Sequence, residues 1–284
     1  MELFHKNNSF SLRLNKSIIY VVCILLSLLS IFPFFIMFVN ATRSTSEIQS
    51  GLSLLPSSHF MTNWNVLIDK SFDPFQGFIN SFIISGGTTL CAVYFSSLTA
   101  YGLVVYNWKF RQPFFTFILC VMMIPAQASA IGFYQFMYQI HWTNNFLPLI
   151  LPSIAAPAIV FFMRQYLLAT LSIEMVEAAR IDGAGEFFTF NRIVMPIMIP
   201  AIATQAIFAF VASWNNLFMP LILLTQKENY TLPIMVSLLK GDIYKTEFGS
   251  IYMGLSLTVL PLFVIYFLLS RYIIAGVALG GVKE

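Results

Sequence analysis

The sequence predicts an all-α polytopic membrane protein with six transmembrane helices. Apolar residues make up 58% of its 284 residues and charged residues only 10%, whereas soluble proteins contain about 45–50% and about 25%. The apolar residues form continuous runs of about 20, the length that a helix needs to cross a bilayer. With 15 basic and 12 acidic side chains, the chain cannot build the charged surface of a soluble fold. Composition therefore excludes a soluble enzyme, a secreted binding domain and a disordered chain.

The first predicted span, Ile18–Val39, follows a short basic stretch with Arg13 and Lys16 and in this respect resembles a signal peptide. Its apolar run is longer than the roughly 7–15 residues of a signal-peptide core, and no small-residue cleavage site follows it closely. We therefore interpret it as a retained anchor. The other predicted spans, in chain order, are Phe78–Tyr106, Pro113–Phe136, Leu147–Leu168, Ile197–Leu224 and Gly249–Ile274.

Lysine and arginine in the connecting loops predict the orientation, because cytoplasmic loops carry an excess of these residues. The richer side is therefore expected to be cytoplasmic, with both termini, and the even number of spans agrees. The richer side holds Lys6, Arg13, Lys16, Lys109, Arg111, Arg164, Arg180, Arg192, Arg271 and Lys283. The poorer side holds Arg43, Lys70, Lys227, Lys240 and Lys245.

Two long segments connect the predicted spans. The external one, 40–77, contains an amphipathic stretch near Trp64–Ile68, which predicts a helix at the membrane surface. The cytoplasmic one, 169–196, carries the strongest functional signal. The expected organisation is a cytoplasmic tail at 1–17, a single six-span domain at 18–274 and a second cytoplasmic tail at 275–284.

Prolines lie within or at the ends of most predicted spans. Each removes a backbone hydrogen bond and can kink a helix, and protein or a water-filled cavity can satisfy the freed groups. This pattern suits a conduit that opens and closes, although proline is also commoner in membrane helices than in soluble ones. The prolines are Pro33, Pro125, Pro152, Pro157, Pro200, Pro220 and Pro261.

The predicted spans carry no Asp, Glu, Lys, Arg or His in their central parts. All three histidines, His5, His59 and His141, fall in the N-terminal tail or the external loops, whereas ion- and proton-coupled carriers usually keep an ionisable group in the bilayer. The sequence has no Walker A pattern, metal-ligand cluster or Ser/His/Asp constellation. We therefore expect no catalytic residue, no metal and no cofactor in this chain, no enzymatic activity and no nucleic-acid partner.

Neutral polar side chains lie in or near the third and fifth spans among many aromatic residues. Amides hydrogen-bond hydroxyl groups and aromatic rings cover the C–H faces of a pyranose, so this set is typical of a path for an uncharged polyhydroxylated solute. Hydrogen bonding between helices is the alternative. A neutral di- or oligosaccharide fits best; acidic glycans, phosphorylated sugars and polyols stay open. The predicted path residues are Gln127, Gln135, Gln205, Trp214, Asn215 and Asn216.

The cytoplasmic segment 169–196, here called the coupling segment, predicts two short helices set at an angle along the membrane face. Ala178 and Ala179 offer a shallow surface that another protein can approach, and Gly183 and Gly185 allow a sharp turn. Alone this could be an ordinary amphipathic loop. Docking of a helix in a partner's groove is the functional alternative.

The coupling segment resembles the EAA motif of ATP-binding-cassette (ABC) importer permeases, and the whole chain is similar to carbohydrate permeases of the maltose-permease second-subunit type. Three departures occur: Ser172, Met195 and Asn216 stand where that family often has proline, leucine and an acid. The matching residues of the motif are Glu177-Ala178-Ala179, Asp182-Gly183-Ala184, Ile193 and Pro196. Further similar stretches are Asn80-Ser81, Ala100-Tyr101, Met123-Ile124-Pro125, Leu151-Pro152, Arg164-Gln165-Tyr166, Ser213-Trp214-Asn215, Tyr230-Thr231-Leu232-Pro233, Arg271-Tyr272 and the tail from Gly280 to Lys283.

The resemblance implies a type I ABC importer permease fold in a bacterial cytoplasmic membrane. It also implies a second permease chain, two ABC ATPase subunits that hold ATP and Mg, and an extracellular solute-binding protein. A passive channel or secondary carrier, and a membrane scaffold without transport, are the rival classes, and dependence on a partner ATPase separates them. The residues implied in coupling are Glu177, Ala178, Ala179, Asp182, Gly183, Ala184 and Pro196.

Overall fold

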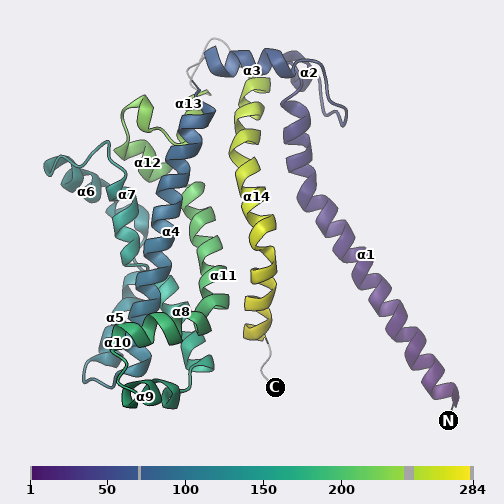
Figure 1. Cartoon of the computed structure of the whole chain (residues 1–284). Coiled ribbons are helices and arrows are strands. Elements are labelled where there is room, and N and C mark those ends of the chain that lie inside the picture. The colour runs from purple at the N-terminus through teal and green to yellow at the C-terminus, as the bar shows by residue number, and fades with distance from the viewer. Residues whose placement is uncertain (1, 70–71, 240–245, 282–284) are drawn as a thin grey trace. The chain divides into compact units, whose positions relative to one another are not determined.

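The computed structural model describes residues 2–69, 72–239 and 246–281, and within these ranges the chain forms helices and turns without a strand (Figure 1). The chain divides into two compact units. One comprises Met1–Phe72 with Leu239–Leu257, and the other Asp73–Leu238 with Thr258–Glu284. The predicted positive charges Lys70, Lys240, Lys245 and Lys283 lie outside the described residues.

The first unit begins with a long helix, α1 (Glu2–Asn40). Its apolar part, Lys16–Asn40, has 25 residues and is about 37 Å long, enough to cross the roughly 30 Å hydrocarbon core. Side chains from Lys16 to Phe35 are all exposed within the chain. A helix that is apolar and exposed all round is typical of a span that faces lipid or another subunit.

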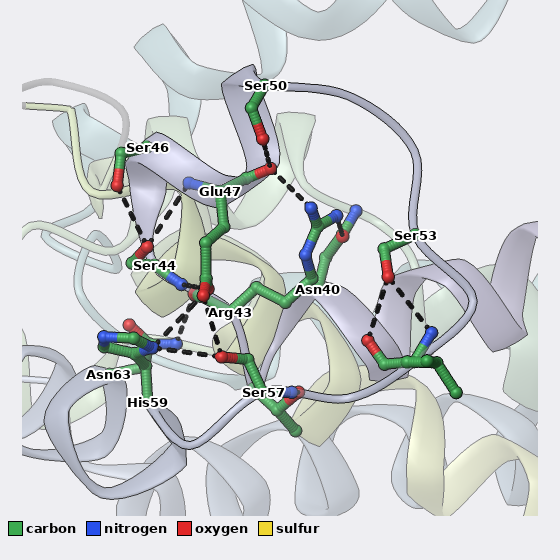
Figure 2. A network of polar contacts seen from close by, with 12 residues as sticks. Asn40, Arg43, Ser44, Ser46, Glu47, Ser50, Ser53, Ser57, His59 and Asn63 are labelled. Atoms are coloured by element: carbon green, nitrogen blue, oxygen red, sulfur yellow. Dashed lines mark hydrogen bonds and ion pairs between the residues drawn. The ribbon is translucent and has the colours of Figure 1, made fainter.

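A polar network fixes the chain after α1 (Figure 2). Arg43, only 7% exposed, donates to Asn40 Oδ1 at 3.0 Å, to Gly51 O at 3.1 Å and to the carbonyl of Glu47. Asn63 Nδ2 donates to the carbonyls of Ala41 and Arg43, both at 2.9 Å. These bonds hold two short helices, α2 (Thr45–Gln49) and α3 (Phe60–Asp69); α3 contains the stretch near Trp64–Ile68 that was expected to be helical.

Glu47 completes this network from the start of α2. It forms a capping box with Ser44, in which Ser44 N donates to Glu47 Oε2 at 2.8 Å and Glu47 N donates to Ser44 Oγ at 3.3 Å. Ser57 Oγ donates to Glu47 Oε1 at 3.0 Å. The backbone bond from Ser44 is the main cause that lowers the pKa of Glu47 below its usual value. The last helix, α14 (Phe248–Gly281), begins beside this network, since Phe248 N donates to Thr45 Oγ1 at 3.0 Å.

The second unit is built around α4 (Pro74–Val105). Most of its buried residues are small, so other helices can approach it closely. Close packing matters here because lipid supplies no hydrophobic driving force for association between membrane helices. At Gly87 an added Cβ would lie 2.9 Å from Ile150 Cδ1, and at Gly77 it would lie 2.9 Å from Met235 Sδ. The buried small residues of α4 are Gly77, Ser81, Ser85, Ala92, Ser96, Ser97 and Ala100.

Helices α8 (Pro157–Thr170) and α11 (Met195–Trp214) pack along α4 (Figure 1). The remaining helices of this unit connect or cover these three. They are α5 (Arg111–Met122), α6 (Ala126–Gln139), α7 (Leu147–Ile150), η1 (Leu151–Ile154), α9 (Ile173–Ile181), α10 (Glu186–Thr189), η2 (Phe190–Val194), α12 (Phe218–Leu223), η3 (Lys227–Asn229) and α13 (Leu232–Leu239).

Polar groups at the start of α4 hold the segment from η3 to α13. Asn80 Nδ2 donates to the carbonyls of Glu228 and Tyr230 at 2.8 and 3.0 Å, and Ser81 Oγ accepts from Leu232 N at 3.0 Å. Two stretches that carried the family resemblance, Asn80-Ser81 and Tyr230–Pro233, are therefore partners in one contact.

The third span differs from the single helix expected at Pro113–Phe136. Arg111–Met122 and Gln127–Gln139 are separate helices that meet at 96°, and neither, at about 18–20 Å, is long enough to cross the hydrocarbon core. Pro125 lies at the break. Because proline has no N–H and disfavours helical geometry in the residue before it, the sequence itself accounts for the interruption.

The fifth span also differs from the expected range Ile197–Leu224. Helical geometry continues without a gap over Glu186–Trp214, through α10, η2 and α11, and this stretch is here called the rod. The second half of the coupling segment is therefore joined to the span without a non-helical break. A π-helical turn, η2, lies before Pro196, and Met195 N donates to Phe190 O within it. This wider turn accommodates the missing N–H of Pro196. The rod ends at Trp214, and Leu217–Leu224 turns away into α12.

We predict that Gly249→Ala destabilises the first unit. A Cβ at this position would lie 2.4 Å from the carbonyl oxygen of Arg43 and 2.5 Å from the amide of Asn63, and such overpacking costs about 1–3 kcal/mol. Thermal unfolding in detergent, followed by size-exclusion chromatography, measures the effect. The control is Gly86→Ala on α4, where nothing lies within 4 Å; it should keep or raise the melting temperature. Equal melting temperatures for the two variants would contradict the predicted clash.

Candidate coupling site and solute path

The turn of the coupling segment depends on Gly183. Helix α9 ends at Asp182, and Gly183 has φ +82°, a left-handed geometry that glycine adopts without strain. Gly183 N donates to Arg180 O at 3.0 Å and Ala184 N to Ala179 O at 2.9 Å, which together form a Schellman cap. Gly185 has φ −68°, so only the first of the two expected glycines is required by the backbone.

Helix α9 has one face against its own chain and one face outside. Val176 and Ala179 are 0% and 7% exposed, and Val176 belongs to an apolar cluster with Tyr101, Met163 and Phe190. The sequence predicts that both alanines offer a surface to a partner. Ala178 is exposed, but Ala179 packs inward, because adjacent residues on a helix point about 100° apart.

The outer face of α9, here called the coupling face, consists of Glu174, Glu177, Ala178 and Ile181. All four are exposed, Ile181 to 86%, and their spacing places them on one side of the helix. Such an arrangement of apolar and charged groups suits docking in a groove.

The remaining expected coupling residues surround the turn or follow it. Asp182 and Gly183 are exposed, Ala184 is half-buried and Pro196 is exposed on the second position of α11. The side chains of Glu177 and Asp182 have no hydrogen bond or ion pair within the described parts of the chain. Side-chain bonds of Glu177 and Asp182 therefore do not contribute to the fold of the segment within the described residues.

Glu186, which the sequence analysis did not single out, connects both sides of this turn to α4. Its Oε1 accepts from Arg180 Nε at 2.6 Å, and its Oε2 accepts from the hydroxyls of Tyr101 at 2.9 Å and Tyr106 at 2.5 Å. The bond to Glu186 raises the pKa of Arg180 further above its usual value. Opposite charges six residues apart across a glycine turn are the sequence signal that could have revealed this group, here called the Glu186 network.

An apolar cluster lies beside the Glu186 network and shares Tyr101 with it. It includes Tyr101 of α4, Met163 and Leu167 of α8, Val176 of α9 and Phe190 at the start of η2. These residues are at most 3% exposed. Helix α9 is thus packed against three other helical segments of the second unit.

A cavity of about 670 Å³ lies between α6, the α7–η1 turn and the segment after α11. Its neutral lining includes Ser129, Phe133, Pro148 and Asn216, and no ionisable side chain lines it among the described residues. Pockets of about 300–1,000 Å³ hold small organic ligands. Phe133 provides an aromatic face, and the hydroxyl and amide are polar groups of the kind that bind sugar hydroxyls.

Of the six expected path residues, only Asn216 lines this cavity. Gln135 lies in a second hollow of about 460 Å³ along α6, with Tyr134, Tyr138 and Gln139. The side chains of Gln127 and Asn215 are exposed elsewhere, and that of Gln205 is half-buried on α11.

Trp214 has a packing role in this conformation. Its side chain is 1% exposed, and Nε1 donates to Thr258 O at 3.0 Å. Its ring stacks on Phe210 with centroids 5.6 Å apart and meets Phe78 edge-on at 5.7 Å. Its indole N–H therefore has a partner and its ring is packed against two other aromatic rings, while its expected place on the solute path stays a prediction.

Comparison with known proteins identifies the family. Residues 92–278 match the family described as "Binding-protein-dependent transport system inner membrane component". The arabinooligosaccharides permease protein AraQ of Bacillus subtilis is 35% identical, over 91% of this chain and 92% of that protein. The lactose permease protein LacG of Rhizobium radiobacter is 32% identical, over 95% and 97%. The sn-glycerol-3-phosphate permease protein UgpE of Yersinia pestis is 26% identical, over 90% and 94%.

A solved structure, that of a bacterial ABC transporter involved in the import of the acidic polysaccharide alginate, has the same fold. The TM-score is 0.77 over 92% of this chain and 97% of that chain, at 21% sequence identity. The expected permease fold is therefore confirmed. From the extent of these matches, the chain is a multi-pass membrane protein that belongs to the family of inner membrane components of binding-protein-dependent transport systems.

Proposed function

We propose that the chain is one of two permease subunits of an ATP-driven importer for a neutral di- or oligosaccharide in a bacterial cytoplasmic membrane. The neutral lining of the cavity supports a neutral solute, because a site for an acidic glycan or a phosphorylated sugar would need basic groups. Relatives that are named for arabinooligosaccharides and lactose support it.

In this proposal both termini and the coupling segment are cytoplasmic. Two ATPase subunits dock from that side and hold ATP and Mg, and one of them receives the coupling face in a surface groove. Glu177 and Asp182, which have no partner in the described residues, pair there with basic groups. Exposed pairs contribute little energy, so they set the register of docking more than its strength. An extracellular binding protein delivers the solute to the opposite side.

In this proposal the Glu186 network passes the movement of the docked α9 helix to the rest of the second unit. When the ATPases close, α9 moves with them, and Glu186 connects α9 to α4 and to the first turn of the rod Glu186–Trp214. Asn216, which lines the cavity, lies two residues beyond the far end of the rod at Trp214. Movement at the coupling face therefore changes the position of a cavity residue without any charge crossing the membrane.

Ile181→Glu tests the docking. Ile181 is 86% exposed, so the variant should fold normally but lose ATPase association, because a desolvated carboxylate is costly in an interface. Co-purification with ATPase and partner permease, followed by assay of ATP hydrolysis, measures the loss. Leu55→Glu on the external segment, where Leu55 is 76% exposed, is the matched control and should behave as wild type. If Ile181→Glu retains its ATPase, or if the purified chain moves solute alone, the importer proposal fails.

Glu186→Ala tests whether the Glu186 network transmits movement from α9 to the solute path. Removal of the carboxylate leaves Arg180 and two tyrosine hydroxyls without their shared partner; we expect ATPase docking to persist and sugar uptake to fall about fivefold, corresponding to about 1 kcal/mol. Uptake of labelled sugar per ATP hydrolysed is the readout. Glu228→Ala, another exposed carboxylate of the same unit, should leave this ratio unchanged. An unchanged ratio for Glu186→Ala would argue against a transmitting role.

Asn216→Asp tests the solute path. A negative charge in the neutral cavity should raise the KM for uptake of a neutral oligosaccharide, because the carboxylate loses the amide's donors and needs solvation. Asn215→Asp, one residue away and outside the cavity lining, is the matched control. Transport assays that measure the KM for both variants test this expectation. Equal effects would mean that the cavity is not on the path.

A further inference from the structure

Two arginines on neighbouring helices form a cluster of positive charge that the coupling mechanism does not use. Arg111 begins α5 and Arg164 lies on α8, and these helices pack together. The Arg164 guanidinium lies over the ring of Phe115, with Cζ 4.0 Å from the ring centroid. The charged group that acts on Arg164 is Arg111, and no carboxylate does so among the described residues.

The Nε of Arg164 lacks a hydrogen-bond acceptor within the described residues. Arg164 is half-buried, and its Nε is enclosed. A partly buried cation is costly unless an anion pairs with it, and a second cation nearby adds repulsion. An anion in contact with both guanidinium groups would relieve both costs. Because the ring of Phe115 covers one face of Arg164 and Nε is enclosed, the two Nη groups are the part left to bind such an anion.

Exposed apolar side chains lie beside both arginines. Phe114 follows Arg111 by about one helical turn and is 42% exposed; Phe161 precedes Arg164 by about one turn and is 39% exposed. Residues three positions apart share a helix face, so each cation lies at the end of an apolar strip. A phospholipid has the same order of groups, with an anionic phosphate followed by acyl chains.

We propose that Arg111 and Arg164 form a binding site for the headgroup of an anionic phospholipid, at the end of the second unit that carries α9. Guanidinium groups bind phosphate in bidentate geometry, and basic groups between membrane helices on the cytoplasmic side suit such headgroups. The acyl chains lie along the strips that contain Phe114 and Phe161. The lipid neutralises the arginine pair and stabilises the contact between α5 and α8.

Native mass spectrometry of the assembled transporter tests this site. The detergent-purified complex, stripped of lipid, is titrated with phosphatidylglycerol, phosphatidylcholine or inorganic phosphate. The wild type should retain phosphatidylglycerol in preference to phosphatidylcholine. Arg111→Gln and Arg164→Gln should each weaken retention about fivefold, and the double variant should lose the preference.

The controls separate this site from general charge effects and from misfolding. Arg192→Gln removes an exposed cation near the rod's first turns and should keep the preference for phosphatidylglycerol. Arg164→Lys keeps the charge but not the bidentate geometry and should bind at an intermediate level if folding is intact. Equal retention of the two lipids by the wild type overturns the proposal, whether because nothing binds or because a partner's acidic side chain fills the site. Full retention by the double variant, or displacement of phosphatidylglycerol by millimolar inorganic phosphate, also overturns it.

Discussion

The close approach of α8 and α11 to α4 is the constraint on which the second unit depends. Lipid is as apolar as the helices, so burial of apolar side chains does not drive their association, and packing must come from small residues and hydrogen bonds. Helix α4 supplies both, with serines and alanines along its buried face and with Asn80 and Ser81 bound to the η3–α13 segment. The coupling segment meets one end of this helix at Tyr101 and Tyr106, so its position is only as well defined as that of α4.

The continuous rod Glu186–Trp214 joins the two functional regions of the chain. Its 29 residues have Glu186 at one end and Trp214 at the other, and Asn216 lies two residues beyond Trp214. A π turn within the rod, at Phe190–Val194, absorbs Pro196 and so prevents a break in the helix. If the helix were interrupted at Pro196, motion of α9 would reach the cavity only through a flexible joint. Continuity of the rod is thus a physical requirement of the proposed coupling.

Hydropathy could predict the spans because it depends on composition alone, and a glycine at position 183 could predict the turn because few other residues adopt its φ. The Glu186 network was out of reach, since its members at positions 101, 106, 180 and 186 meet only when the helices pack. The packing of Trp214 was out of reach for the same reason: a tryptophan beside two asparagines is compatible with a solute site, and only the structure shows that its ring contacts Phe78 and Phe210. The sequence was enough to predict which segments are helices. Which side chains of different helices contact one another could be learned only from the structure.

The placement of charge explains why mechanical linkage is needed. Within the described residues of the second unit, the Arg180–Glu186 pair and the Arg111–Arg164 cluster involve the helix ends near α9, whereas the cavity lining is neutral. A neutral solute gains nothing from membrane potential, and a neutral cavity cannot bind a driving ion in the way that an intramembrane carboxylate does. In the proposed mechanism, energy therefore arrives as movement at the coupling face. The charged groups lie at the α9 end of the rod, where Glu186 pairs with Arg180, and the proposed displacement reaches Asn216 through the apolar remainder of the helix.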